Sequence, residues 1–353
     1  TFAQANEGAQ VTLTGGDFDN MVNYTRRNSA GQSVFEARSG STLNLSDISI
    51  TRNFPFGDAI DVTPDGSIFF GTIAGEDSQL NLENSSINNS YGAGAISWNG
   101  GTANIVSSVI NDSGGLSIAD GTTEEGVLNF VNSILYMTGG DDLSQTNRIQ
   151  ALAGGEAHVL ASTVLYDTLN TSSNGCNRGI AYGCNGMPLT ATAGGVLNFE
   201  SSVALTLNAD FVFPRKDSYS EFSSGDLVAG DFSYIAATQA QDSDAVRDLF
   251  GNLSIITEGL AYDLLETSVP EIPFFFKPLP DGAIPAADGA LYSVIPDAVP
   301  GGANELLNPI DGLPIIIDVY GNPRANASGF RDIGAVQLGL APTLKLTATG
   351  DAL

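Results

Sequence analysis

The chain is poor in basic residues, and this shortage limits its partners. Its 353 residues include 13 lysines and arginines against 40 aspartates and glutamates, which gives a net charge of −27. Such a surface repels phosphate backbones and anionic lipids, so we expect no nucleic-acid partner. Apolar runs of the roughly 20 residues that cross a bilayer are also missing, and we therefore expect no membrane-spanning segment.

Histidine and cysteine are scarce as well, which argues against a zinc site. A structural zinc ion takes about four ligands, whereas His158 is the only histidine and the chain has 2 cysteines. Cys176 and Cys184 lie in a Gly- and Asn-rich stretch, where we expect a local disulfide that pins a surface loop. A disulfide indicates an oxidising compartment and a secreted protein. The alternative is a pair of reduced thiols.

A twelve-residue phrase recurs six times. Its copies are TLNLSDISITRN from Thr42, QLNLENSSINNS from Gln79, TANIVSSVINDS from Thr102, VLNFVNSILYMT from Val127, AHVLASTVLYDT from Ala157 and VLNFESSVALTL from Val196. The second, fourth and ninth positions are mostly apolar and the third is Asn, although the fifth copy has His158 second and Val159 third. Apolar–polar–apolar alternation predicts a short strand with one buried face. Because one unit cannot bury that face alone, we expect the copies to stack as coils of a solenoid.

The middle of each phrase predicts a bend after its first strand. The sixth position holds a residue type that favours tight turns, namely Asp47, Asn84, Ser107, Asn132, Ser162 and Ser201. The seventh is a small hydroxyl residue in five copies, which predicts a polar ladder at the corner. Copies that begin 23 and 25 residues apart, at 79, 102 and 127, favour parallel strands that wind helically. An antiparallel sandwich would need hairpin turns that are sparse here, and a leucine-rich repeat would need its spaced leucines and a helical half.

The phrases divide the chain into three parts. Residues 1–263 form the predicted β-helix, with insertions at 54–77 and 169–195 and one short helix near 244–250. Residues 264–340 are Pro-rich and too apolar for a free linker, so we expect an extended capping segment laid over the solenoid. Residues 341–353 alternate like a linker or the first strand of a following module, as expected for a piece of a longer surface protein; a frayed terminus is the equal alternative.

The repeat resembles the right-handed parallel β-helix surface proteins of bacteria, including adhesins. A more specific resemblance is to the closing segment of many secreted bacterial β-helix proteins, and it is carried by Asp288, Asp318, Gly321, Arg324, Asp332, Ile333, Gly334 and Ala335. Gln337 departs from that pattern, which more often has Glu. The resemblance implies a right-handed β-helix with an irregular C-terminal tail that closes it. As capping residues we expect Arg324 and Asp332, paired over the last coil to seal its strand edge.

Two acidic groups are candidates for catalysis or calcium binding. Lyases and hydrolases on parallel β-helices work with paired carboxylates, and Asp141 with Asp142, near Arg148, is such a pair; turn formation is the plainer explanation. The signatures of pectin hydrolases are absent. The candidate metal ligands are Asp17, Asp19 and Asn20 in GGDFDN, a spacing that is common by chance. We expect no other cofactor, and we interpret His158 as a partly buried structural imidazole.

These observations favour a non-enzymatic, extracellular structural or adhesive protein of a bacterial surface: a stalk, an adhesin, or a building block of a surface layer or filament. A strand edge left uncovered at the amino end could add a coil of another subunit, so homo-oligomers or head-to-tail polymers are expected partners. The alternatives are a carbohydrate-active enzyme and a glycan-binding module. In the latter, Trp98 would stack on the sugar, although packing at a coil corner is the plainer explanation.

Overall fold

The structure is built from strands that pair in parallel. The computed structural model describes residues 3–19, 35–51, 72–74, 77–88, 95–98, 100–111, 116–119, 125–138, 149–152, 154–167, 189–192, 194–207, 226–229, 232, 234–237, 254–257, 265–266, 277–278, 295–325 and 327–337. These residues contain strands and no helix. The expectation of an all-β fold is therefore confirmed. The expected helix near 244–250 lies outside the described residues.

One sheet has seven strands, and we name it sheet A. All of its neighbouring strands are parallel. In spatial order, which is also chain order, they are β1 (Ala3–Ala5), β3 (Phe35–Ala37), β5 (Thr72–Ala74), β8 (Ala95–Trp98), β11 (Leu116–Ala119), β14 (Ile149–Leu152) and β17 (Leu189–Thr192). Strands β5 and β17 fall within the two ranges that the sequence marked as insertions.

The other large sheet, sheet B, has fifteen parallel strands in two halves that meet at a bend. Two ten-residue strands, β2 (Gln10–Asp19) and β4 (Thr42–Thr51), run through both halves. The first half continues with β6 (Gln79–Glu83), β9 (Thr102–Val106), β12 (Val127–Val131), β15 (Glu156–Leu160), β18 (Val196–Glu200) and β20 (Asp226–Ala229). The second half continues with β7 (Ser86–Asn88), β10 (Val109–Asn111), β13 (Ile134–Thr138), β16 (Thr163–Asp167), β19 (Val203–Leu207), β21 (Tyr234–Ala237) and β22 (Ser254–Thr257). A separate antiparallel pair joins β23 (Leu265–Glu266) to β24 (Lys277–Pro278).

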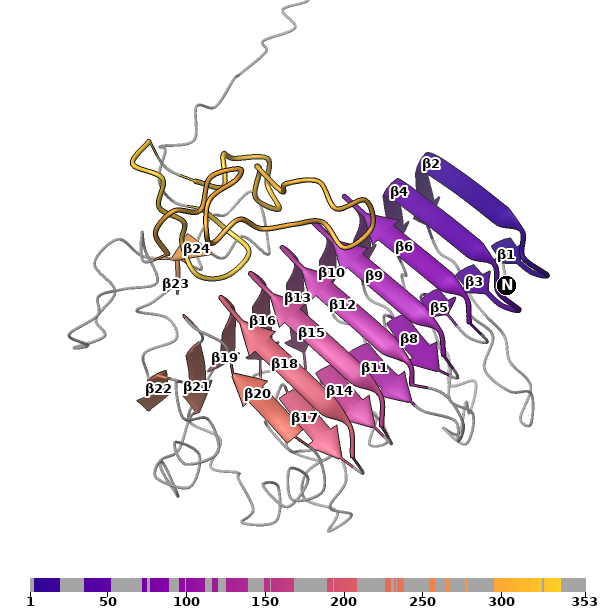
Figure 1. The fold of residues 1–353 in the computed structure, drawn as a ribbon, viewed down its shortest axis with the longest axis horizontal. Helices are drawn as coiled ribbons and strands as arrows, with labels where there is room; N and C mark the ends of the chain where they lie inside the picture. The colour runs from indigo at the N-terminus through magenta and orange to yellow at the C-terminus, as the bar shows by residue number, and fades with distance from the viewer. Residues whose placement is uncertain are drawn as a thin grey trace, which may run out of the picture.

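The chain visits these sheets in a fixed order. Strand β8 lies in sheet A, β9 follows in the first half of sheet B, and β10 follows in its second half. The next three strands, β11, β12 and β13, repeat that path. Each strand pairs with its equivalent one circuit later. Figure 1 shows the resulting stack, from indigo strands at the N-terminus to orange strands. The strands therefore curl as in a β-helical solenoid, and we call each circuit a coil.

The apolar positions of the phrase form one continuous core. In the first copy Leu43, Leu45 and Ile50 are at most 3% exposed. Their equivalents in the next coil are fully buried, and they are Leu80, Leu82 and Ile87. The same cluster extends through all later copies. Because strand residues two apart share a face, positions two and four both point inward. The predicted stacking of apolar side chains along the solenoid axis is confirmed.

The fifth copy is shifted by one residue from the sequence-based alignment. Leu128 pairs with Ala157, and Asn129 pairs with His158, so this copy begins at Glu156. Ala157 and Val159 are therefore the core residues, and both are at most 1% exposed. His158 occupies the outward position that is Asn in the other copies. The sequence-based placement of His158 at an apolar position was wrong, because a one-residue shift exchanges the two faces of a strand.

In each copy of the phrase, the bend inside sheet B is made by one residue in a left-handed conformation. The six bend residues have φ between 48° and 55°, and they are Asp47, Asn84, Ser107, Asn132, Ala161 and Ser201. Asn and Asp tolerate this region better than most residues. The predicted bend is thus confirmed, with Ala161 rather than Ser162 at the sixth position of the fifth copy.

A ladder of serines follows the bend. The hydroxyl of Ser108 accepts a hydrogen bond from the main-chain N–H of Ser85 in the preceding coil (3.1 Å) and donates to the carbonyl of Val106 (2.8 Å). Ser133 and Ser162 repeat this pattern in the next two coils. The sequence had predicted a hydroxyl ladder here. Its hydroxyls bind main-chain groups at the bend rather than one another.

A second ladder of amides runs along the outer face of sheet B. Asn81 donates to Asn44, Asn104 donates to Asn81, and Asn129 donates to Asn104, each through Nδ2 to Oδ1 at 2.7 Å. Asn104 is 1% exposed, so water cannot hydrate its amide. The hydrogen bonds to the neighbouring amides replace that hydration. The row reaches His158 in the following coil, where Asn198 contacts the ring Nδ1 at 3.3 Å.

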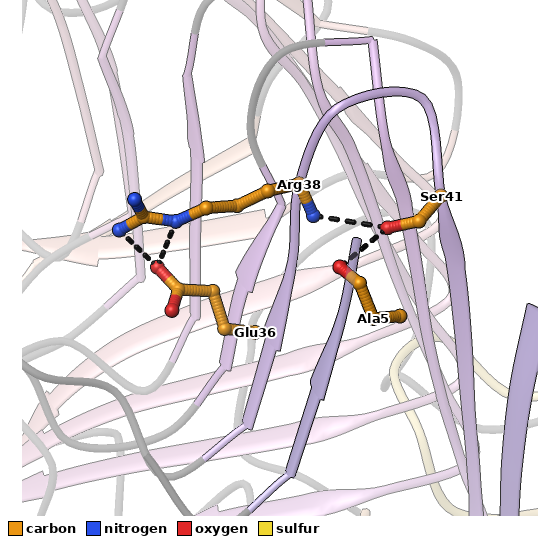
Figure 2. Close-up of polar contacts among 4 residues, drawn as sticks. All are labelled: Ala5, Glu36, Arg38 and Ser41. Carbon is orange, nitrogen blue, oxygen red and sulfur yellow. Dashed lines mark hydrogen bonds and ion pairs between the residues drawn. The ribbon is translucent and has the colours of Figure 1, made fainter. Parts of the chain in front are cut away.

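Where the chain passes from sheet A to sheet B, side chains tie neighbouring coils together (Figure 2). The hydroxyl of Ser41 donates to the carbonyl of Ala5 in the preceding coil (2.7 Å) and accepts from the N–H of Arg38 (3.0 Å). The Arg38 guanidinium pairs with Glu36, which projects from β3 and is 4% exposed. The turn is thus stabilised by a hydrogen bond to the preceding coil, from Ser41, and by an ion pair within its own coil, between Arg38 and Glu36.

The observed register predicts opposite effects for two adjacent substitutions. His158→Asn restores the residue of the other coils and should stabilise the fold by about 0.5–1.5 kcal/mol through new amide hydrogen bonds. Val159→Asn places an amide in the core and should cost about 2–4 kcal/mol. Urea unfolding followed by circular dichroism measures both. If His158→Asn were the more damaging change, the observed register would be wrong.

Candidate functional site on the flank of the solenoid

A C-terminal segment of residues 295–337 packs against the outside of the solenoid, along the bend in sheet B. In Figure 1 it is the orange-to-yellow chain that lies across the strands. Asn308 donates to Glu83 Oε1 (2.9 Å), Asn132 donates to the carbonyl of Ile317 (3.0 Å), and the N–H of Gly334 donates to the carbonyl of Ser201 (3.0 Å). The segment therefore spans the coils from β6 to β18.

Apolar contacts hold the segment in place. Leu306 packs with Val131 and Ala161, which lie at the end of a strand and at the bend. Farther along the segment, Ala335 and Val336 pack on Ile134 of β13. These solenoid side chains face outward, so their apolar character is explained by the segment that covers them.

Asp318 organises the turn in the middle of the segment. Its carboxylate is 1% exposed and accepts hydrogen bonds from the N–H groups of Tyr320 (2.9 Å), Asn322 (2.8 Å) and Gln337 (2.9 Å). Gly321, at the turn, has φ of 84°. One buried carboxylate thus fixes residues that are far apart in the segment. Burial, followed by the charge of Asp318, raises the pKa of the Tyr320 hydroxyl.

Two arginines of the segment are buried where it meets the solenoid. Arg324, 1% exposed, donates through Nη2 to the carbonyls of Ala161 (3.2 Å) and Gly334. Burial, and then the charge of Arg331, lower its pKa to about 9, while Asp318 and Asp332 oppose this shift. Burial likewise lowers the pKa of Arg331 to about 10. The structure thus brings Arg324 close to Asp332, beside the coils of β15 and β18. The expected role of Arg324 and Asp332 in closing the last coil stays a prediction.

The segment forms a cavity of about 220 Å³ that is open to solvent on one side. Its walls are mostly aliphatic side chains and prolines, with one carboxylate and one guanidinium. Among the lining residues are Val299, Leu306, Pro314, Ile315, Glu305 and Arg324. Sequence reasoning did not anticipate this cavity, because its walls come from turns that carry no periodic signal.

His158 lies in a different polar group, on the outer face of the first half of sheet B. Its Nε2 is 3.3 Å from Glu156 Oε1, and the Asn198 amide donates to the same carboxylate oxygen at 3.1 Å. The side chains of His158 and Glu156 are 37% and 38% exposed. The imidazole therefore faces solvent instead of the core, as a hydrogen-bonded member of the outer row.

The other candidate residues are described only in part or lie outside the described part of the chain. Asp17 is exposed on β2, which ends at Asp19, and Asn20 lies outside the described residues. Trp98 ends β8, and its side chain is not among those described. The remaining candidates all fall outside the described ranges: Asp141, Asp142, Arg148, Cys176 and Cys184. In the described ranges, no three His, Cys, Asp or Glu side chains are placed to hold a metal ion.

Comparison with protein-family models, curated proteins and solved structures gives no match. Within the part of the chain that the structure describes, no helix is long and apolar enough to span a membrane.

Docking of the segment depends on a glycine in its closing motif. A Cβ on Gly334 would lie 2.7 Å from Thr163 Oγ1 and 3.0 Å from Val203 Cγ1, at a φ of +93°. Gly334→Ala should therefore loosen the segment and increase its cleavage in limited proteolysis. Gly321→Ala is the matched control, because its φ is +84° but a Cβ there has open space. It should add only about 1–2 kcal/mol of backbone strain. Equal cleavage of the two variants would contradict this role of Gly334.

Glu83 predicts a pH dependence of stability. Burial, followed by the charge of Asp311, raises the pKa of its carboxyl above 4.5, although the hydrogen bond from Asn308 opposes the shift. A raised pKa in the folded state means that this group loses stabilising effect as pH rises through that value. Glu83→Gln keeps an acceptor for Asn308 without the charge, so its melting temperature should exceed that of the wild type at pH 7.

This difference should vanish below about pH 4, where the wild-type carboxyl is protonated in both states. Glu125→Gln, at an exposed position, is the control and should show no such convergence. A constant difference from pH 3 to pH 8 would contradict the electrostatic explanation.

Proposed function

We propose that this chain is a non-enzymatic structural rod of an extracellular bacterial surface, serving as a stalk, an adhesin or a building block of a surface layer or filament. Its coils wind right-handed, as parallel crossover connections almost always do. The C-terminal segment 264–340 serves as its cap, with residues 295–337 along the flank of the coils from β6 to β18 and Arg324 and Asp332 closing the last coil. The acidic surface, with a net charge of −27, keeps such a rod soluble and apart from anionic surfaces.

The observation that carries this proposal is the continuity of bonding from coil to coil. The apolar core, the amide row and the serine ladder all run through the same successive coils. Buried polar side chains such as Asn104 and Ser133 are engaged in these links. A load applied along the axis would therefore be shared among many parallel contacts, which suits a mechanical role.

The amino end supports a role in assembly. Strand β2 pairs with β4, and β1 pairs with β3, so within the described residues each is an edge strand. An edge ten residues long can add a strand from another chain. We therefore propose head-to-tail association of copies at this end, although the shared negative charge opposes it at low ionic strength.

Single-molecule pulling on the two ends of the chain tests the mechanical role. The wild type should unfold in repeated steps as coils detach, and Asn104→Ala should lower the force of the steps that break its coil. Asn198→Ala removes an amide from a later coil of the same amide row and is the positional control. It should leave the steps of the Asn104 coil unchanged. Unfolding in one weak transition, unaffected by Asn104→Ala, would contradict a load-bearing solenoid.

The enzymatic alternative is tested on the same protein. Incubation with pectin, alginate and other uronates, with and without calcium, should release no oligosaccharides. Depolymerisation that disappears in Asp141→Ala or Asp142→Ala would overturn the non-enzymatic assignment.

A further inference from the structure

Large apolar side chains are concentrated on the outer surface of the C-terminal segment. Seven such side chains are exposed in the described residues, and five of them lie between 299 and 317. These five, which we name the apolar face, are Val299 (38% exposed), Leu307 (46%), Leu313 (61%), Ile316 (59%) and Ile317 (45%). Exposed large apolar side chains that gather on one segment point to an interaction site more than single scattered ones do.

The cavity and the apolar face share residues. Val299 and Ile316 both line the 220 Å³ cavity, which Pro314 and Pro323 also line. Sites for drug-sized ligands hold roughly 300–1,000 Å³. The smaller cavity is suited to one aliphatic or aromatic side chain, anchored beside an exposed apolar surface.

The backbone beneath the apolar face is held rigidly. Leu307 forms an antiparallel bridge with Pro314, and Ile317 forms another with Pro323. Between these bridges, Ile315 packs against the cluster that joins the segment to the solenoid. A surface ordered in advance loses little conformational entropy when a partner binds.

The solvent-exposed charges of the segment are all negative, and the one positive group that lines the cavity, Arg324, is buried. Asp297 and Asp311 are exposed and Glu305 is partly exposed, whereas the basic residues of the described segment, Arg324 and Arg331, are buried. Anionic lipids and further copies of a chain with a net charge of −27 would be repelled. A partner with positive charges would be attracted, and its on-rate increased.

We propose that the apolar face and its cavity bind an extended, basic segment of another protein. One aliphatic or aromatic side chain of that segment enters the cavity, and flanking lysines or arginines lie near Asp297, Glu305 and Asp311. This interaction goes beyond the structural role proposed above and does not require it.

Fluorescence anisotropy with three labelled octapeptides tests the proposal. The first has a central Leu-Phe pair flanked by lysines, the second has the same pair flanked by glutamates, and the third has lysines around Ser-Ser. The first alone should bind saturably, because both the anchor and the charge are required. Its affinity should fall with rising salt, and Glu305→Gln should weaken it and reduce the salt dependence.

Substitutions locate the binding surface. Leu313→Ser and Ile316→Ser should each weaken binding of the first peptide at least tenfold, while leaving the melting temperature unchanged because both side chains are exposed. Val228→Ser, 50% exposed on β20, is the matched control and should bind as the wild type does. A double variant, Leu313→Ser with Ile316→Ser, checks that any remaining binding comes from elsewhere.

Three results would overturn the proposal. They are failure of all three peptides to bind, equal binding of the Leu-Phe and Ser-Ser peptides, and binding that Leu313→Ser and Ile316→Ser leave intact. Self-association of the wild type that Leu313→Ser abolishes in sedimentation velocity would make a second copy the occupant instead. Each result leaves the pulling and depolymerisation outcomes unaffected, so the structural role is judged separately.

Discussion

The structure depends on parallel strands that stack in register from one coil to the next. Parallel neighbours place equivalent residues above one another at the strand spacing of about 4.8 Å. A position that is apolar in one coil must then be apolar in the next, and an amide meets an amide. Asn44, Asn81 and Asn104 satisfy one another for this reason. The same constraint makes a shift of one residue costly, because it would move core side chains into solvent.

The solenoid alone does not account for its outward apolar residues. Val131 and Ile134 face away from the axis, and they are buried because the segment 295–337 covers them. In docking, the segment also buries Arg324 away from water, which lowers the pKa of its guanidinium. The carbonyls of Ala161 and Gly334 compensate part of that desolvation. The outer surface of the same segment, in contrast, leaves aliphatic side chains exposed, and the charged side chains of the segment that reach solvent are the acidic Asp297, Glu305 and Asp311.

Most of the core was predictable from the phrase, since five copies place their second, fourth and ninth residues inside as expected. The alignment of the fifth copy was wrong for a specific reason. Its sequence AHVLAS fits the apolar–polar alternation in two registers, and Ala157 is a weaker apolar signal than Leu160. Leu160 is apolar because the C-terminal segment packs against it from outside. Tertiary contact thus produced a pattern that imitated a core position.

The sequence by itself determined the local periodicity, the bend after each first strand and the apolar tail, because these follow from residue type and spacing along a few residues. Only the tertiary structure decided the register of the fifth copy, the solvent-facing position of His158 and the cavity beneath the apolar face. Each of these depends on contacts between distant parts of the chain, such as the bond between Asn132 and Ile317, which are 185 residues apart. No pattern of neighbouring residues encodes which outer surface such a segment will cover.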